Sequence, residues 1–370
     1  MRILYVAPQY DYGRKSRGLS FEHFNFYQSL CAMGLEVAYF DYPTLVDELG
    51  RRETNRRLEA IVRSDRPDVL FGVVRRDLID KRAMRRISEQ TDTVTINWFC
   101  DDHWQFESHA RAWTPCFNHV VTTSQTALAQ YRRHGLTNVI KSQWAANQHA
   151  YRPTRGACVH DVTFVGQPYG VRAQAVEALR RAGVRVKAWG NGWEAGKLDQ
   201  AEMVRVFGTS RINLNFADAS SETRTRLEAL ASSHAVATLR DKPALWRLWS
   251  GAQRAAQWSK SRAQRSVNAP PRQIKGRVFE VPACGGFLLT QPAEDLDAYL
   301  EPGVDCATFE SLDDLIDQVR YYLDHEEERR AIAERGYQRT LAEHTYAERF
   351  EAIFRRAGVR CFHEPDRLAA

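Results

Sequence analysis

Short runs of apolar residues alternate with stretches of helical periodicity from the start of the chain. The apolar runs predict five strands, at residues 3–8, 36–42, 68–74, 93–99 and 119–124. The first helix is predicted to have Ser20 as its N-cap and to end at Gly34, because the aromatic residues between them recur at helical spacing. This β-α-β alternation predicts a parallel sheet covered by helices on both faces, and therefore an α/β fold.

The same pattern starts again in the second half of the chain. Five further strands are predicted at residues 161–166, 184–190, 211–216, 286–290 and 305–309. The connection at residues 147–159 contains Pro153 and Gly156 and has no clear periodicity, so we expect the domain boundary there. The predicted domains are residues 1–150 and 151–345, followed by a C-terminal helical segment at 346–370. Ligands of open α/β sheets bind beyond the carboxyl ends of the strands, which predicts a site in a cleft between the two sheets.

Composition fits a soluble protein with two such domains. The 370 residues are 44% hydrophobic and 26% charged, and the length suits two domains of about 150 to 200 residues. No run approaches the roughly 18 apolar residues that cross a bilayer, and the first residues lack an apolar signal-peptide core, so we expect a cytoplasmic protein. The seven cysteines are scattered without a CxxC pair, which indicates reduced thiols.

Positive charge is concentrated in one stretch. Residues 240–277 contain ten Lys or Arg and one acid, Asp241, with three tryptophans interleaved. Such a stretch suits a phosphate-rich partner such as nucleic acid. It equally fits a solvated helical insertion, at about residues 219–270, whose tryptophans pack on the body of the protein.

The segment at residues 273–290, QIKGRVFEVPACGGFLLT, has the parts of a nucleotide-diphosphate site. Lys275 and Arg277 come at the start of a predicted helix, where backbone N–H groups and cations together attract phosphate. Glu280, one turn further, is placed to accept both hydroxyls of a ribose. The pair Gly285 and Gly286 is predicted to end the helix in a left-handed turn and to let a ligand approach the backbone.

Two acids and a histidine follow the predicted strand at residues 93–99. Asp101, Asp102 and His103 are candidate catalytic residues, since a carboxylate or imidazole there can act as general base on an acceptor hydroxyl. In the alternative interpretation, Asp102 caps the next helix and His103 is exposed. A metal site is not expected, because three adjacent residues on an extended segment point in different directions.

Two further loops follow predicted strands. The loop after the first strand is basic and rich in glycine, and it is predicted to contact an acceptor or a donor phosphate; its candidate residues are Tyr12, Gly13, Arg17 and Gly18. After residues 161–166, Gly166 permits close approach of a ligand, and Arg172 is either a phosphate ligand or a surface residue. The chain contains no GxGxxG, GxxxxGK[ST], GxSxG or HExxH motif, which excludes the usual dinucleotide, P-loop, hydrolase and zincin sites.

The segment KGRVFEVPACGGFLLT and the helical sequence after it resemble the CgeB-like glycosyltransferases of the group 1 set. The segments YGRKSRGLSFEHFNFY, INWFCDDHWQF and DVTFVGQPYGVR also resemble that group, so the likeness covers nearly the whole chain except about residues 218–270. It implies a GT-B fold, in which two Rossmann-like domains face a central cleft. The C-terminal domain would hold the nucleotide sugar, and the last helix would cross back to the N-terminal domain.

The resemblance also implies roles for single residues. Glu280 would bind the ribose, while Lys275, Arg277 and Arg172 would contact the diphosphate and the two glycines would shape the turn beside it. Retaining relatives commonly carry a second glutamate eight positions earlier, where this chain has Arg272. Retention or inversion at the sugar therefore stays open.

The leading hypothesis is a glycosyltransferase that moves a sugar from a nucleotide-diphosphate sugar to an acceptor hydroxyl, with no metal and no further cofactor. The acceptor is open among glycan, small molecule, protein and nucleic acid. One alternative is a nucleic-acid binding protein, or a glycosyltransferase acting on nucleic acid, through residues 240–277. Another is a non-catalytic relative with a structural role.

Overall fold

The computed structural model describes residues 1–75, 77–154, 156–217 and 272–359. By its internal contacts the chain divides into one unit of residues 1–217 and 274–370, which contains both sheets, and a second of residues 218–273. The predicted basic insertion at residues 219–270 lies outside the described residues.

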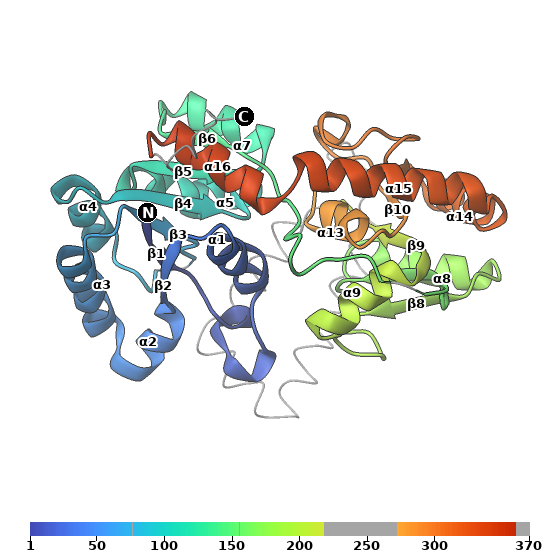
Figure 1. Cartoon of the computed structure of the whole chain (residues 1–370), viewed down its shortest axis with the longest axis horizontal. Helices are drawn as coiled ribbons and strands as arrows, with labels where there is room; N and C mark the ends of the chain where they lie inside the picture. The colour runs from blue at the N-terminus through green and yellow to red at the C-terminus, as the bar shows by residue number, and fades with distance from the viewer. Residues whose placement is uncertain (76, 155, 218–271, 360–370) are drawn as a thin grey trace, which may run out of the picture. The chain divides into compact units, whose positions relative to one another are not determined.

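The first half of the chain forms a six-stranded parallel sheet in the order β2-β1-β3-β4-β5-β6 (Figure 1). Its strands are β1 (Arg2–Val6), β2 (Glu36–Phe40), β3 (Val69–Gly72), β4 (Val94–Phe99), β5 (His119–Thr122) and β6 (Val139–Lys141). The five predicted strands of this half are confirmed. The three-residue edge strand β6 was not predicted, because its apolar run is too short to stand out.

Helices cover both faces of this sheet, because alternate residues of its strands are apolar and buried on opposite sides. Ile3 and Tyr5 of β1 belong to one buried cluster, and Leu4 and Val6 belong to another. The helices of this half are α1 (Gln28–Ala32), α2 (Tyr42–Leu49), α3 (Arg51–Asp65), α4 (Lys81–Gln90), α5 (Asp102–Gln105), α6 (Arg111–Trp113) and α7 (Gln125–Arg133).

The first predicted helix is less regular than expected. Ser20 does act as a cap, with its Oγ accepting a 3.0 Å hydrogen bond from the backbone N–H of His23. A π-helical turn at His23–Tyr27 then precedes α1.

The second half forms a five-stranded parallel sheet in the order β11-β10-β9-β7-β8. Its strands are β7 (His160–Val165), β8 (Val186–Trp189), β9 (Ser210–Asn215), β10 (Leu288–Thr290) and β11 (Ala307–Thr308), and all five were predicted. Its helices are α8 (Arg172–Arg181), α9 (Gln200–Gly208), α13 (Arg277–Ala283), α14 (Leu312–Asp324) and α15 (Glu326–Glu343). The chain therefore has an α/β fold with two Rossmann-like parallel sheets.

The final helix, α16 (Tyr346–Arg356), packs against the first sheet (Figure 1). The ring of Phe350 lies 5.3 Å from that of Phe71 on β3 and 5.8 Å from that of Phe26. The backbone N–H of Tyr346 donates a 3.0 Å hydrogen bond to the carbonyl of Ala146. No helix in the described part of the chain is both long and apolar enough to span a membrane.

Candidate functional site

A buried carboxyl group lies just after the C-terminal end of β4. Asp102, the first residue of α5, is 1% exposed, and its Oδ2 accepts a 2.9 Å hydrogen bond from the hydroxyl of Tyr131 on α7. Its other oxygen has no hydrogen-bond partner among the described residues. Burial raises the pKa of Asp102 to about 7. The expectation that Asp102 caps the helix is wrong, because Asp101 occupies the N-cap position.

The neighbouring imidazole is also buried, so the alternative of an exposed His103 is wrong. His103 is 6% exposed, and within the described ranges neither ring nitrogen has a hydrogen-bond partner. Burial, followed by the positive charge of Lys275, lowers the pKa of His103 to about 4. The ring is therefore neutral at physiological pH and keeps both a donor and an acceptor for a ligand.

Lys275 joins two of the predicted groups of residues. It is half-buried and precedes α13, and its charge acts on His103 at the end of β4. The structure thus brings the basic start of the segment at residues 273–290 together with the acid and histidine group. Sequence alone placed them in different halves of the chain.

Glu280 lies deeper than the ribose role suggests. It is fully buried in α13, and its Oε1 accepts hydrogen bonds from the Tyr151 hydroxyl at 2.7 Å and from the Asn25 amide at 3.5 Å. Its Oε2 forms an ion pair with Arg277. Oε1 already accepts two hydrogen bonds and the whole side chain is buried, so a ribose hydroxyl could reach this carboxylate only if one of these protein contacts moved.

Arg277 is the first residue of α13, and its charge is balanced by Glu280. Its guanidinium also lies 5.4 Å from the centre of the Phe207 ring. Of the two predicted phosphate-binding cations in this segment, Arg277 is thus committed to a buried acid one turn away.

The glycine pair after α13 ends the helix as predicted. Gly285 has φ of +71°, and its N–H donates to the carbonyl of Pro282 at 2.7 Å, while the N–H of Gly286 donates to that of Val281 at 3.1 Å. The close approach at Gly286 involves the protein itself, since a Cβ there would lie 2.5 Å from the carbonyl oxygen of Phe207. Both glycines are required by the fold around the site.

Arg172 is 7% exposed, so the alternative of a surface residue is wrong. Its guanidinium donates to the carbonyls of Phe216 at 3.2 Å and Gln167 at 3.4 Å, and lies 3.7 Å from the centre of the Tyr169 ring. It therefore connects the segments that follow β7 and β9. Gly166 lies on the first of these segments, and a Cβ there would come 2.7 Å from the Phe164 ring.

The basic loop after β1 is closed at its base by a bridge between Tyr10 and Leu19. Arg17 donates to Asp11 at 3.2 Å, and its guanidinium lies 4.5 Å from the centre of the Tyr12 ring. The two glycines of this loop, Gly13 and Gly18, both have positive φ.

Several residues of this site carried no sequence signal. Tyr131 is 29 residues from Asp102, and Tyr151 and Asn25 are 129 and 255 residues from Glu280. A lone tyrosine or asparagine is too common to single out, and only the fold brings each to its carboxylate.

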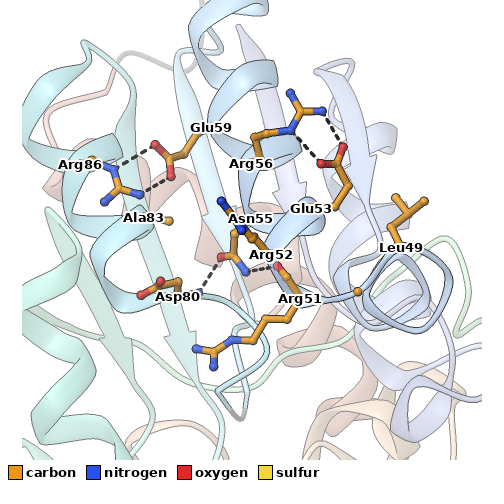
Figure 2. A pocket seen from close by; sticks show the side chains of 11 residues that line it. Leu49, Arg51, Arg52, Glu53, Asn55, Arg56, Glu59, Asp80, Ala83 and Arg86 are labelled. Atoms are coloured by element: carbon orange, nitrogen blue, oxygen red, sulfur yellow. Dashed lines mark hydrogen bonds and ion pairs between the residues drawn. The ribbon is translucent and has the colours of Figure 1, made fainter.

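A separate groove of about 880 Å³ lies between α3 and α4 (Figure 2), and it contains none of the predicted site residues. Two of its arginines are paired, Arg56 with Glu53 and Arg86 with Glu59. Arg51, at the start of α3, has no side-chain partner among the described residues.

No group of three His, Cys, Asp or Glu that could hold a metal occurs in the described ranges.

The model of a family described as glycosyl transferase-like matches residues 172–255 and 253–355. No curated protein sequence matches this chain.

The fold resembles solved glycosyltransferase structures. HepE of Anabaena, in complex with UDP and glucose, is 10% identical with a TM-score of 0.57, over 97% of this chain and 99% of that one. Sucrose-phosphate synthase of Thermosynechococcus elongatus is 9% identical with a TM-score of 0.59, over 96% and 98%. A glycosyltransferase of Rickettsia africae is 9% identical with a TM-score of 0.58, over 96% and 97%. These likenesses establish the GT-B fold.

Proposed function

We propose that this chain, which belongs to the glycosyl transferase-like family, transfers a sugar from a nucleoside-diphosphate sugar to an acceptor hydroxyl without a metal ion. One observation carries the assignment of the site. A buried, neutral imidazole at His103, with no hydrogen-bond partner in the described part of the chain, lies within the electrostatic reach of Lys275. The segments quoted above favour a CgeB-like subgroup.

The chemistry is mainly electrostatic. The departing diphosphate gains negative charge as the sugar leaves, and the Lys275 ammonium is the cation placed to stabilise it. The neutral His103 ring can donate a hydrogen bond to a sugar hydroxyl or accept the proton of the acceptor hydroxyl. Asp102 is almost completely buried and is held by Tyr131, so it positions the first turn of α5, which carries His103.

Glu280 is proposed to hold Arg277 and to bind the ribose after exchange of one hydrogen bond. The Asn25 amide is the donor most readily exchanged, because its hydrogen bond to Oε1 is 3.5 Å long against 2.7 Å for the Tyr151 hydroxyl, while Arg277 forms an ion pair with the other oxygen. UDP is the first nucleotide to test, since UDP is the ligand in the HepE complexes.

Donor binding and turnover test this proposal directly. Thermal shift of the full chain with UDP, GDP, dTDP and CMP should show a rise in Tm with one nucleotide diphosphate, because a ligand at 100 times its Kd stabilises by about 2.7 kcal/mol. Release of the same nucleotide from its sugar conjugate should continue in EDTA. Absence of any shift would remove the donor site, whereas turnover that stops in EDTA and returns with added Mg²⁺ would overturn only the metal independence.

A further inference from the structure

Arg75 was not among the predicted residues, yet it lies at the edge of the first sheet that carries the candidate site. Arg75 lies three residues after Gly72, the last residue of β3, and Gly72 is in register with Asn97 of β4. Cys100 lies three residues after Asn97, so Arg75 and Cys100 occupy equivalent positions on neighbouring strands. Because parallel strands end at the same edge, Arg75 lies beside the segment of Asp101 and His103.

The backbone of Arg75 is fixed by one side chain. The Tyr42 hydroxyl accepts a 3.0 Å hydrogen bond from the Arg75 N–H and donates a 3.1 Å hydrogen bond to its carbonyl. Tyr42 is itself buried, at 1% exposure. The direction in which the arginine leaves the sheet is therefore set by the core.

The guanidinium is only partly used by the protein. One of its amino groups donates a 2.5 Å hydrogen bond to Glu22, and it also hydrogen-bonds with the Cys100 thiol. Burial raises the pKa of that thiol to about 12, so it stays neutral beside the cation. The Arg75 side chain is still 46% exposed, whereas that of Glu22 is 8% exposed.

An arginine has five N–H donors in a planar fork, and the protein contacts described above engage only part of that fork. Glu22 lies on the protein side of the pair and orients the fork. The exposed remainder is suited to a planar or tetrahedral oxyanion, which an arginine binds through two parallel hydrogen bonds.

We propose that Arg75 binds an anionic group, a carboxylate or a phosphate, on the acceptor substrate. The inference rests on the proposed function and narrows its acceptor to a compound that carries such a group near the reacting hydroxyl. It also gives Glu22 a role, as the residue that aims the guanidinium and moderates its affinity for an anion.

Inorganic phosphate is the probe, titrated calorimetrically into the full chain in the presence of saturating UDP, which occupies the donor phosphate site. Wild-type protein should bind phosphate, and R75Q should lose at least about tenfold in affinity, as is typical of a lost charge-assisted hydrogen bond. R51Q is the matched control: it removes an arginine of the groove in Figure 2 whose side chain has no partner in the described part of the chain, and it should bind phosphate as the wild type does.

The variant E22Q separates ligand binding from a purely structural ion pair. It removes the competing carboxylate, so phosphate should bind more tightly than to the wild type. The double variant E22Q/R75Q leaves no buried unpaired charge and should fold while failing to bind phosphate. Equal phosphate affinity in wild type and R75Q, a loss confined to R51Q, or absence of phosphate binding by the wild type would overturn the inference.

The UDP titration that precedes the phosphate titration keeps the two proposals apart. If UDP fails to bind, UDP is not the donor nucleotide, and the comparison of wild type, R75Q and E22Q still reports on the anion site. If UDP binds and the three proteins bind phosphate alike, only the assignment of Arg75 fails.

Discussion

Asp102 and His103 are adjacent in the chain, and burial holds both side chains in their neutral forms between about pH 4 and about pH 7. The carboxyl group is stabilised as the acid, and the imidazole is stabilised as the base. Neither side chain is therefore charged in this pH range. An exposed aspartate would be ionised over most of the range, and an exposed histidine would be protonated below about pH 6.5.

Stability against pH should reveal this pair. The pKa of Asp102 is raised in the folded state, so its contribution is full below about pH 4 and is lost as the pH rises through about 7. The pKa of His103 is lowered, so its contribution is present above about pH 6.5 and is lost as the pH falls through about 4. The two effects oppose each other, and the wild type should show little net slope from this pair.

Single variants should unmask the two slopes. In D102N the unfolding free energy should rise between pH 4 and 6.5, and in H103Q it should fall between pH 4 and 7, each relative to the wild type. The slopes should reach about 1.4 kcal/mol per pH unit. Urea denaturation across this range measures them, and equal slopes in the three proteins would contradict the assigned burial effects.

Removal of the Lys275 charge should change both the affinity for the donor nucleotide and the pKa of His103. In K275M the affinity for the nucleotide diphosphate should fall about tenfold or more, because a phosphate loses its cationic partner. The pKa of His103 should rise, since the lysine charge opposes protonation of the ring. NMR titration of the ring and calorimetry with UDP measure the two effects.

Lys187, an exposed lysine on β8, provides the control for that experiment. K187M should leave the nucleotide affinity and the His103 titration unchanged. A K275M protein that binds UDP as tightly as K187M would remove Lys275 from the donor site.

The buried network around Glu280 should respond unequally to two substitutions. E280Q leaves the Arg277 guanidinium without its anion and should cost about 3 kcal/mol of unfolding free energy, the low end for a broken buried pair because Arg277 is partly exposed. Y151F removes one hydrogen bond to a carboxylate that keeps two other partners, and should cost about 1.5 kcal/mol. Urea denaturation at pH 7 gives both values, and a larger loss in Y151F would reverse this ordering.

The two glycines after α13 should differ in their tolerance of alanine. G285A should cost about 1 to 2 kcal/mol, because alanine must adopt φ near +71°. G286A should lower the unfolding free energy by more than G285A. Its Cβ would lie 2.5 Å from the backbone carbonyl oxygen of Phe207, which cannot move as the end of a flexible side chain could. G183A is a control, with positive φ and open space around the added carbon, and should resemble G285A.

The regular parts of this fold could be predicted because buried parallel strands are continuous apolar runs, which a sequence shows directly. The strand β6 was not predicted, because it is only three residues long, and the π-helical turn before α1 has no apolar pattern of its own. The Gly285 turn was predictable because a helix stop is a local event.

Contacts across the chain were not predictable in this way. Arg172 has the same spacing from β7 whether it binds phosphate or ties two loops together, and only its burial shows the second arrangement. Arg75 and Tyr42 are 33 residues apart, and nothing in either local sequence indicates that one fixes the other. Long-range polar pairs depend on the packed fold, while apolar periodicity does not.

The packing of α16 on the first sheet also bears on how the chain folds during synthesis. Phe71 on β3 is buried partly by the rings of Phe350 and Phe354, which are synthesised 279 and 283 residues later. A ribosome that has released only the first half exposes this apolar face of the sheet. The first sheet is thus translated first, but its packing is complete only after α16 has been synthesised. Until then the exposed apolar face of the sheet makes the nascent chain prone to aggregation.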